Sequence, residues 1–147
     1  MSTPTYDDLQ VGDVLEARSY RLTRADLVRY CGASNDYNVI HWNDRIAEAV
    51  GLPGVIAHGM LTMAQAGRFV TEWAGDPGRV VSLSTRFSRP VVVPDDEDGA
   101  TVTVAGTVRA KEDGLVTLAL DATTGQAPDD VRVLSGAKAV VRLAWVS

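Results

Sequence analysis

The stretch HGMLTMAQAGRFVTEWA, residues His58 to Ala74, has the pattern of a long amphipathic helix. Its apolar residues recur mostly at spacings of three and four, which brings them to one side of a helix. They are Met60, Leu61, Ala64, Phe69, Val70 and Trp73. Small Ala66 and Gly67 allow a second layer to approach closely. We expect this segment to be the central helix of the fold.

The chain beyond Gly78 alternates apolar and polar residues with period two and is rich in Val, Thr and Leu, which is typical of β-strands. The predicted strands are Val80–Phe87, Ala100–Lys111, Leu115–Thr123 and Val131–Trp145. Their one-sided apolar rows are Val102, Val104 and Val108, then Val116, Leu118 and Leu120, then Val133, Ala137, Ala139, Val141 and Leu143. Lys111 to Gly114 predicts a tight hairpin turn, and Pro94 to Gly99 predicts an exposed turn.

The chain before His58 predicts one strand and two short helices. The strand is Val14–Leu22, and a helix of about Arg24 to Tyr30 follows the cap Thr23. The turn-forming residues in Cys31 to His41 predict a loop. The second helix is expected to start at its cap Asn43, to bury Ile46, Ala47 and Val50, and to end at Gly51 and Pro53.

This order of elements predicts an α+β protein. When a curved antiparallel sheet wraps one mostly apolar helix, the apolar surfaces of the helix and of the sheet are both buried. That arrangement is the hot-dog fold. We expect a single domain over residues 1–147, because neither a repeat nor a low-complexity linker divides the chain. The open edges of a single sheet also favour side-by-side dimerisation.

The composition of the chain excludes some classes of protein and disfavours some kinds of partner. The 147 residues are 46% apolar and 22% charged, as in ordinary globular proteins, and the net charge of -5 disfavours a nucleic-acid partner. The stretch Ala57 to Ala74 is too polar to span a membrane. With Cys31 as the single cysteine, neither an intrachain disulfide nor a cysteine-based zinc site is expected. No secretory signal is recognisable in residues 1–10, so a cytoplasmic location is expected.

The first candidate site is Asp36-Tyr37-Asn38-Val39-Ile40-His41, which brings a carboxylate, an amide and an imidazole onto one loop. Elimination of water from a 3-hydroxyacyl thioester needs a base for the α-proton and an acid for the hydroxyl, and these groups suit both tasks. Asn38 can orient either group by hydrogen bonding. The spacing alone favours a simpler alternative, in which Asp36 and Asn38 make turn hydrogen bonds and His41 packs beside Trp42.

The second candidate site is the start of the long helix, at His58, Gly59 and Met60. First-turn N–H groups have no partner within a helix, and the helix dipole is positive there, so a thioester oxygen that gains enolate charge would be stabilised. Gly59 has no side chain to block the approach. The alternative is ordinary packing of a helix start.

Other polar and aromatic residues carry weaker signals. His58 and His41 lack the spacing of a third metal ligand, so no metal is assigned. We expect solvated surface charges at Arg79, Arg86 and Arg89. The alternative is that these arginines contact a pantetheine phosphate or an acidic carrier protein. A role in the core or in an interface is expected for Trp42, Trp73 and Trp145.

The loop Asp36 to His41 resembles the Asp-x-Asn-Pro-x-His signature of the MaoC-like (R)-specific hydratase and dehydratase family. Ala57-His58-Gly59-Met60-Leu61 is similar to the second motif of that family, and Arg86-Phe87 with Pro90-Val91 and Pro94-Asp95 is similar to its strand signature. Val39 stands where the family usually has proline, which leaves the backbone of this loop less restricted.

The resemblance implies the hot-dog fold, the catalytic pair Asp36 and His41, and an oxyanion donor from the backbone near Gly59. It also implies a substrate carried on acyl carrier protein (ACP) or coenzyme A (CoA), and a homodimer or a heterodimer with a related hot-dog subunit, without a cofactor. Two alternatives stay open: a hot-dog acyl thioesterase, for which the long helix offers only Gln65 and Glu72, and a non-catalytic acyl-binding subunit of a hetero-oligomeric dehydratase.

Overall fold

The computed structural model describes residues 3–125 and 129–145. The order of its elements is the α+β order expected from the sequence. They are β1 (Val14–Leu22), α1 (Arg24–Ser34), η1 (Val39–His41), α2 (Asp44–Ala49), α3 (Gly59–Ala74), η2 (Pro77–Arg79), β2 (Val80–Phe87), β3 (Ala100–Glu112), β4 (Leu115–Thr124) and β5 (Val131–Arg142), where η denotes a 3-10 helix.

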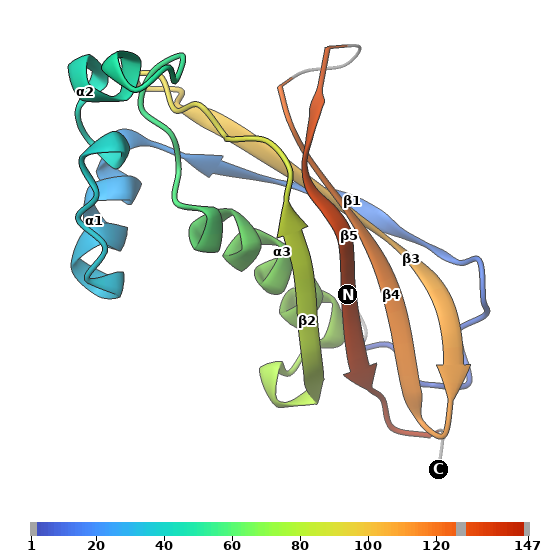
Figure 1. Cartoon of the computed structure of the whole chain (residues 1–147). Helices are drawn as coiled ribbons and strands as arrows, with labels where there is room; N and C mark the ends of the chain where they lie inside the picture. The colour runs from blue at the N-terminus through green and yellow to red at the C-terminus, as the bar shows by residue number, and fades with distance from the viewer. Residues whose placement is uncertain (1–2, 126–128, 146–147) are drawn as a thin grey trace.

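The strands form one antiparallel sheet in the order β1-β3-β4-β5-β2. In it, β1 pairs with β3 and β2 pairs with β5, so β1 and β2 are the edge strands. The sheet curves around α3, which lies along one of its faces, while α1 and α2 lie near one end of the molecule (Figure 1). This is the hot-dog fold. The single-domain organisation over 1–147 stays a prediction.

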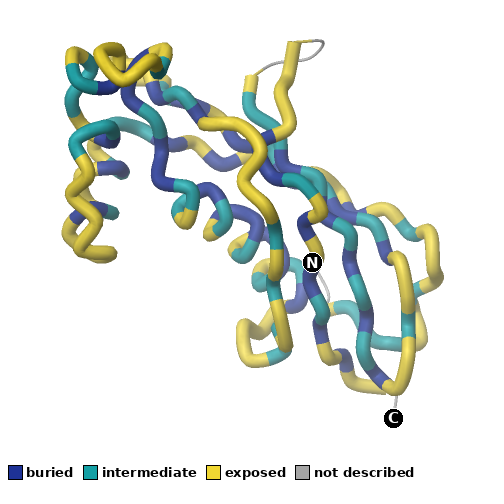
Figure 2. The backbone as a smooth tube through the Cα atoms, viewed as in Figure 1, coloured by how far each residue is buried: buried dark blue, intermediate teal, exposed yellow. Residues whose placement is uncertain are grey.

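The core lies between α3 and the sheet, where the buried residues are concentrated (Figure 2). The predicted apolar rows of β3, β4 and β5 are all buried. Gly106 on β3 allows the close approach of the helix, because a Cβ there would lie 3.1 Å from the ring of Phe69 and 3.2 Å from Leu15. By contrast, none of the residues of β2 is buried.

The face that α3 buries differs from the predicted apolar face. Phe69 and Val70 are buried as expected, but Met60 is 57% exposed and Ala64 is also exposed. Thr62 and Gln65 are buried in their place. The spacing of apolar residues could not distinguish the side of the helix that faces the sheet from the side beside the open strand β2.

The predicted loop Cys31 to His41 was too long. Helix α1 continues to Ser34, whose hydroxyl donates to the carbonyl of Tyr30, and it ends at Asn35 in the left-handed region with φ 59°. Cys31 is buried, as is Leu27 one helical turn earlier, so packing extends the helix through residues that favour turns. Residues Val39–His41 are also helical.

Smaller differences concern the ends of elements. Asn43 caps α2 as predicted, but Val50 lies beyond the last helical residue and is 63% exposed, so the expectation of a buried Val50 was wrong. Strand β5 ends at Arg142 rather than at Trp145, whose ring packs at a tilted angle against the ring of Tyr6. The turn between β3 and β4 is shorter than predicted and consists of Asp113 and Gly114, both with positive φ.

Within the described ranges, no helix is both long enough and apolar enough to cross a membrane.

Candidate active site

The loop after α1 is held by short polar side chains that each accept a hydrogen bond from a backbone N–H two residues later. The Ser34 hydroxyl accepts from Asp36 N–H at 3.2 Å, and the Asp36 carboxylate accepts from Asn38 N–H at 3.2 Å. The Asn38 carboxamide oxygen then accepts from Ile40 N–H at 3.3 Å. These turn hydrogen bonds fix the loop and leave the second carboxylate oxygen of Asp36, Oδ2, for other contacts.

His41 is buried at the end of η1 and faces Asp36. Its Nδ1 lies 2.7 Å from the carbonyl oxygen of Ile56. A carbonyl only accepts, so Nδ1 carries the hydrogen, and in the neutral ring Nε2 carries the lone pair. Nε2 lies 4.0 Å from Asp36 Oδ2, too far for a hydrogen bond. His41 Nε2 and the carboxylate of Asp36 therefore face each other across a short gap.

His58 lies behind this pair and is 2% exposed. Its Nε2 is 3.1 Å from the backbone carbonyl of Asp36, to which it donates, and 3.7 Å from the thiol of Cys31. Burial is the largest cause that lowers the pKa of His58, which favours the neutral ring. In the described parts of the chain, its Nδ1 is the buried side-chain nitrogen or oxygen that lacks a hydrogen-bond partner.

The two imidazole rings stack on each other. The ring centroids of His41 and His58 are 3.7 Å apart with planes 23° apart, and the ring of Tyr30 meets His58 edge-on at 4.8 Å. The stack holds His41 from the side opposite to the solvent and fixes the plane in which its Nε2 lies.

A metal ion does not fit this geometry well, although the ligand atoms of Asp36, His41 and His58 lie within 4.8 Å of one another. A metal ion binds to imidazole in the plane of the ring, and two nearly parallel stacked rings cannot direct lone pairs at one ion. In addition, His41 Nδ1 and His58 Nε2 already face carbonyl oxygens. The absence of a metal stays a prediction.

The start of α3 lies beside the pair. His58 is the N-cap residue of α3, but its side chain does not cap the helix, so the first-turn N–H groups, which have no acceptor within the helix, are not satisfied by this residue. A cavity of about 310 Å³ is lined there by Gly59, Thr62 and Phe87 among others. A Cβ on Gly59 would lie 3.3 Å from the ring of Phe87, so glycine keeps this approach to the backbone open.

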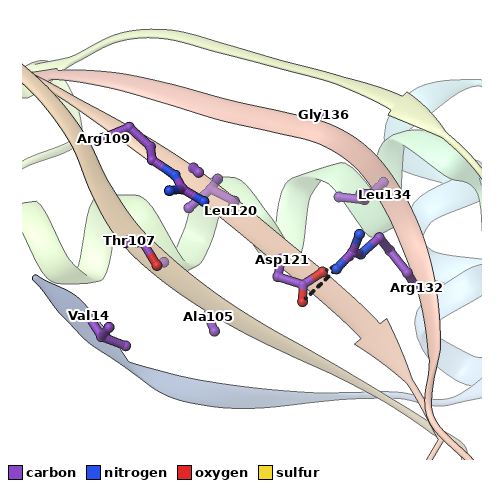
Figure 3. Close-up of a pocket in the computed structure, with 11 residues that line it drawn as sticks. Val14, Ala105, Thr107, Arg109, Leu120, Asp121, Arg132, Leu134 and Gly136 are labelled. Carbon is purple, nitrogen blue, oxygen red and sulfur yellow. Dashed lines mark hydrogen bonds and ion pairs between the residues drawn. The ribbon is translucent and has the colours of Figure 1, made fainter. Parts of the chain in front are cut away.

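A second hollow of about 380 Å³ lies away from these residues, on the face of the sheet opposite to α3 (Figure 3). Its rim includes Arg109 and the ion pair of Asp121 with Arg132, in which N and O are 2.7 Å apart. Small residues such as Ala105 and Ala119 make the hollow. It contains none of the predicted catalytic residues, so the volume of a hollow alone does not identify the site.

The structure brings the first and second candidate sites of the sequence analysis together. Asp36, His41, His58 and Gly59 lie in one cluster, although they come from a loop and from a helix start. The expectation for Asn38 needs a correction: its carboxamide caps η1, and its backbone N–H, not its side chain, binds Asp36.

Three residues that contribute to the site were missed in the sequence analysis: Ile56, through its carbonyl, Tyr30 and Cys31. The spacing of Leu27 and Cys31 fits one helical face and was a usable signal for the longer helix α1. Local spacing carries no signal for the Ile56 carbonyl, because its contact with His41 joins residues from separate segments.

The arginines and tryptophans have varied surroundings. Arg79 donates to the carbonyl of Ala74 at the end of α3, while Arg86 and Arg89 are exposed. Trp42 is 47% exposed and Trp145 is 57% exposed, so neither is a core residue, and Trp73 packs partly buried against the core.

Comparison with known proteins shows the family to which the chain is similar. A protein-family model described as a MaoC like domain matches residues 8–126. The 3-hydroxyacyl-thioester dehydratase X of Mycobacterium tuberculosis is 39% identical over 74 residues, which cover 50% of this chain and 25% of that protein. The (R)-specific enoyl-CoA hydratase of Rhodospirillum rubrum is 32% identical over 105 residues, which cover 68% of this chain and 72% of that protein.

A solved structure described as a MaoC-like dehydratase is similar over 97% of this chain, with a TM-score of 0.86 and 38% identity. The chain spans 43% of that solved chain and only 25% of the mycobacterial relative, so it is shorter than both. The family match includes the loop of Asp36 and His41, the start of α3 and the strands β2 to β4. The chain therefore belongs to the MaoC-like family.

Proposed function

We propose that this chain catalyses the reversible dehydration of (3R)-hydroxyacyl thioesters, carried on ACP or CoA, to trans-2-enoyl thioesters. It would then be a hydro-lyase. The family match supports this class of reaction. The observation that carries the proposal is the 4.0 Å separation of His41 Nε2 and Asp36 Oδ2, with Nδ1 of His41 held by the carbonyl of Ile56.

In dehydration, His41 and Asp36 act on adjacent carbons of the substrate. His41 Nε2 accepts the α-proton, and the carboxylate of Asp36 orients the hydroxyl by accepting its hydrogen bond. The proton gained by His41 then passes to the departing hydroxyl, and water leaves. In hydration the same steps run in reverse. The short gap between the two groups supports this scheme, because the α-hydrogen and the hydroxyl are on neighbouring atoms.

The backbone N–H groups of Gly59 and Met60 would hold the thioester oxygen. They belong to the first turn of α3, where partial positive charge stabilises the oxygen as it gains enolate character. Loss of one such donor typically costs about 3 to 4 kcal/mol of the barrier.

Asn38 and His58 support the pair. Asn38 donates its backbone N–H to Asp36 and caps η1 with its side chain. His58 donates to the Asp36 carbonyl and stacks on His41. The lowered pKa of His58 keeps a second positive charge away from His41.

We also propose that the chain works as a dimer with a second hot-dog chain, identical or related. The edge strand β2 has unpaired backbone on one side, and it carries exposed Val81 and Phe87. Met60, whose backbone N–H is one of the two proposed oxyanion donors, is also exposed on α3. Asp36 is half exposed, so a partner on this side would supply the missing wall of the substrate site. The cytoplasmic location and the absence of a cofactor stay predictions.

The test is the loss of the enoyl-thioester absorbance band when the purified protein meets crotonyl-CoA or a longer trans-2-enoyl-CoA. Wild type should consume the band, and Asp36→Asn and His41→Gln should each slow turnover by at least about a hundredfold. Asp98→Asn, in the exposed turn, is the matched control and should behave as wild type. Equal turnover in the wild type and both site variants would refute the proposal.

The two alternatives make different predictions. A thioesterase would release free thiol from an acyl-CoA, but Glu72 is engaged by Arg18 and Arg68, and Gln65 is buried, so α3 has no free carboxylate to direct water. A non-catalytic acyl-binding subunit would not consume the band alone. It would co-purify with a second hot-dog chain that carries the activity.

A further inference from the structure

The loop between Asp36 and His41 has, at Asn38 and Val39, a backbone conformation that valine does not impose. Asn38 has φ -54° and ψ 128°, and Val39 begins the helix η1. An extended ψ followed by the first position of a helix is the geometry that a proline at position 39 would favour. Valine does not lock the φ angle of this residue as the ring of proline does. Hydrogen bonds in and around the loop must therefore select the conformation.

One contact spans this turn from end to end. The indole Nε1–H of Trp42 donates to the carbonyl of Tyr37 at 3.1 Å. Tyr37 directly follows Asp36, and Trp42 directly follows His41. The hydrogen bond therefore joins the two residues next to the proposed catalytic pair and closes the loop between them.

Burial does not account for the position of Trp42. Its side chain is 47% exposed and that of Tyr37 is 59% exposed, so neither is held by the core. The side-chain hydrogen bonds of Asp36 and Asn38 each reach only two residues along the chain. Both ends of the loop are also tied to the start of α3, because His58 donates to the carbonyl of Asp36 and His41 donates to the carbonyl of Ile56. Among the described contacts of this loop, the Trp42 hydrogen bond is the one that joins the residues at its two ends directly to each other.

We propose that Trp42 is a positioning residue, whose indole N–H holds Asp36 and His41 at their working separation in place of a backbone restriction. This inference rests on the proposed function for its kinetic readout. Trp42 does not touch the reacting atoms. It acts by restricting the loop, so its loss lowers the fraction of molecules in which the two groups face each other.

The substitution Trp42→Phe tests this, because it keeps an aromatic ring and removes the N–H. We expect kcat for hydration of crotonyl-CoA to fall about three- to tenfold, the size expected from one hydrogen bond, with KM changed less than twofold. Trp145→Phe is the matched control: this ring is similarly exposed, at 57%, but packs at a tilted angle against the ring of Tyr6, outside the loop. It should keep the wild-type kcat.

The decisive variant is Val39→Pro combined with Trp42→Phe. Proline restores the restriction through the backbone, so kcat should return to within about twofold of wild type. Unchanged kcat in Trp42→Phe, or no recovery in the double variant at an unchanged melting temperature, would overturn the inference. A merely structural role would lower the melting temperature and leave the kcat of folded protein unchanged.

Hydrogen exchange of the peptide that covers residues 36–42 gives a readout that needs no activity. Exchange should be faster in Trp42→Phe and should return towards wild type in the double variant, because proline again restricts the loop. Equal exchange in wild type and Trp42→Phe contradicts the inference. Failure of the proposed function is distinguishable, because wild type would then be inactive on the enoyl thioester while the exchange comparison still tests the role of Trp42.

Discussion

The imidazole rings of His41 and His58 stack with centroids 3.7 Å apart and planes 23° apart, and Nε2 of His41 lies 4.0 Å from Asp36 Oδ2. Two rings of the same type therefore have different environments. His41 Nε2 is directed towards a half-exposed carboxylate, whereas His58 is almost fully buried and donates to a backbone carbonyl. Environment, and not residue type, separates the proposed proton carrier from its support.

Replacement of His58 by Phe should lower kcat about tenfold. Phenylalanine keeps a ring against His41 and Tyr30 but removes the hydrogen bond to the carbonyl of Asp36, whose loss releases that backbone. Steady-state hydration of an enoyl-CoA measures the effect. Cys31→Ala removes the other neighbour of Nε2 and should keep at least half of wild-type kcat. Equal losses in the two variants would indicate general repacking.

Stability should decrease as pH falls through the range where His58 accepts a proton. Burial holds the pKa of His58 below its ordinary 6.5, so the unfolded chain binds this proton more readily than the folded chain. The stabilisation is complete above pH 6.5 and is lost as pH falls through the lowered pKa. The carboxyl groups of Asp26 and Glu72 also have lowered pKa values, but their ordinary values are 3.8 and 4.5, so they act at lower pH.

Melting temperatures at pH 7.5 and pH 5.5 check this expectation. Wild type should melt at a lower temperature at pH 5.5, and His58→Phe should show a smaller difference between the two values, because it has no proton to gain. An identical pH dependence in the two proteins would contradict the role of His58.

Gly59→Ala should lower activity and leave stability almost unchanged. The new Cβ would lie 3.3 Å from the ring of Phe87, which is 55% exposed at a strand end and can shift by a few tenths of an ångström. The methyl group would, however, crowd the N–H groups proposed to hold the thioester oxygen. We expect kcat/KM to fall at least tenfold, as measured with crotonyl-CoA.

Gly67→Ala in the same helix is the control for Gly59→Ala. Its Cβ would make an ordinary contact of 3.4 Å with Leu83, and alanine is the better helix former by roughly 0.5–1 kcal/mol. This variant should be as stable as wild type or more stable, with unchanged kcat/KM. Equal loss of activity in both variants would argue against oxyanion donors at Gly59.

Gly106→Val should destabilise the fold by about 1–3 kcal/mol, because overpacking of a tight core costs that much. Even a Cβ at this position of β3 would lie 3.1 Å from Phe69 and 3.2 Å from Leu15. Urea unfolding measures the change. Gly136→Val is the matched comparison, since no atom lies within 4 Å of its Cβ, although its φ of 57° adds backbone strain without overpacking. A Gly106→Val variant as stable as wild type would contradict the close helix–sheet contact.

Local pattern was sufficient for much of the fold. Alternation located β1 and β2 to the residue, although β2 has no buried residue. It also located the starts and the buried rows of β3, β4 and β5, because each of these three strands buries one face against α3. The long helix begins one residue after its predicted start, at Gly59. The cap residues Thr23 and Asn43 also function as predicted, since capping depends only on residues within one turn.

The sequence failed where packing overrode propensity. It ended α1 four residues early, because the burial of Cys31 outweighs the turn preference of Gly32 and Ser34. It also could not tell that Met60 would be exposed and Gln65 buried, because the amphipathic pattern does not say which neighbour covers which side of α3.

The sequence by itself determined which functional groups are present: a carboxylate and an imidazole five residues apart on a loop, and a glycine at a helix start. Only the tertiary structure decided how these groups are used. It brings the Ile56 carbonyl to Nδ1 of His41 and stacks His58 behind that ring. These contacts join residues that are 15 and 17 positions apart, so their geometry depends on how the start of α3 packs against the loop, which no local pattern specifies.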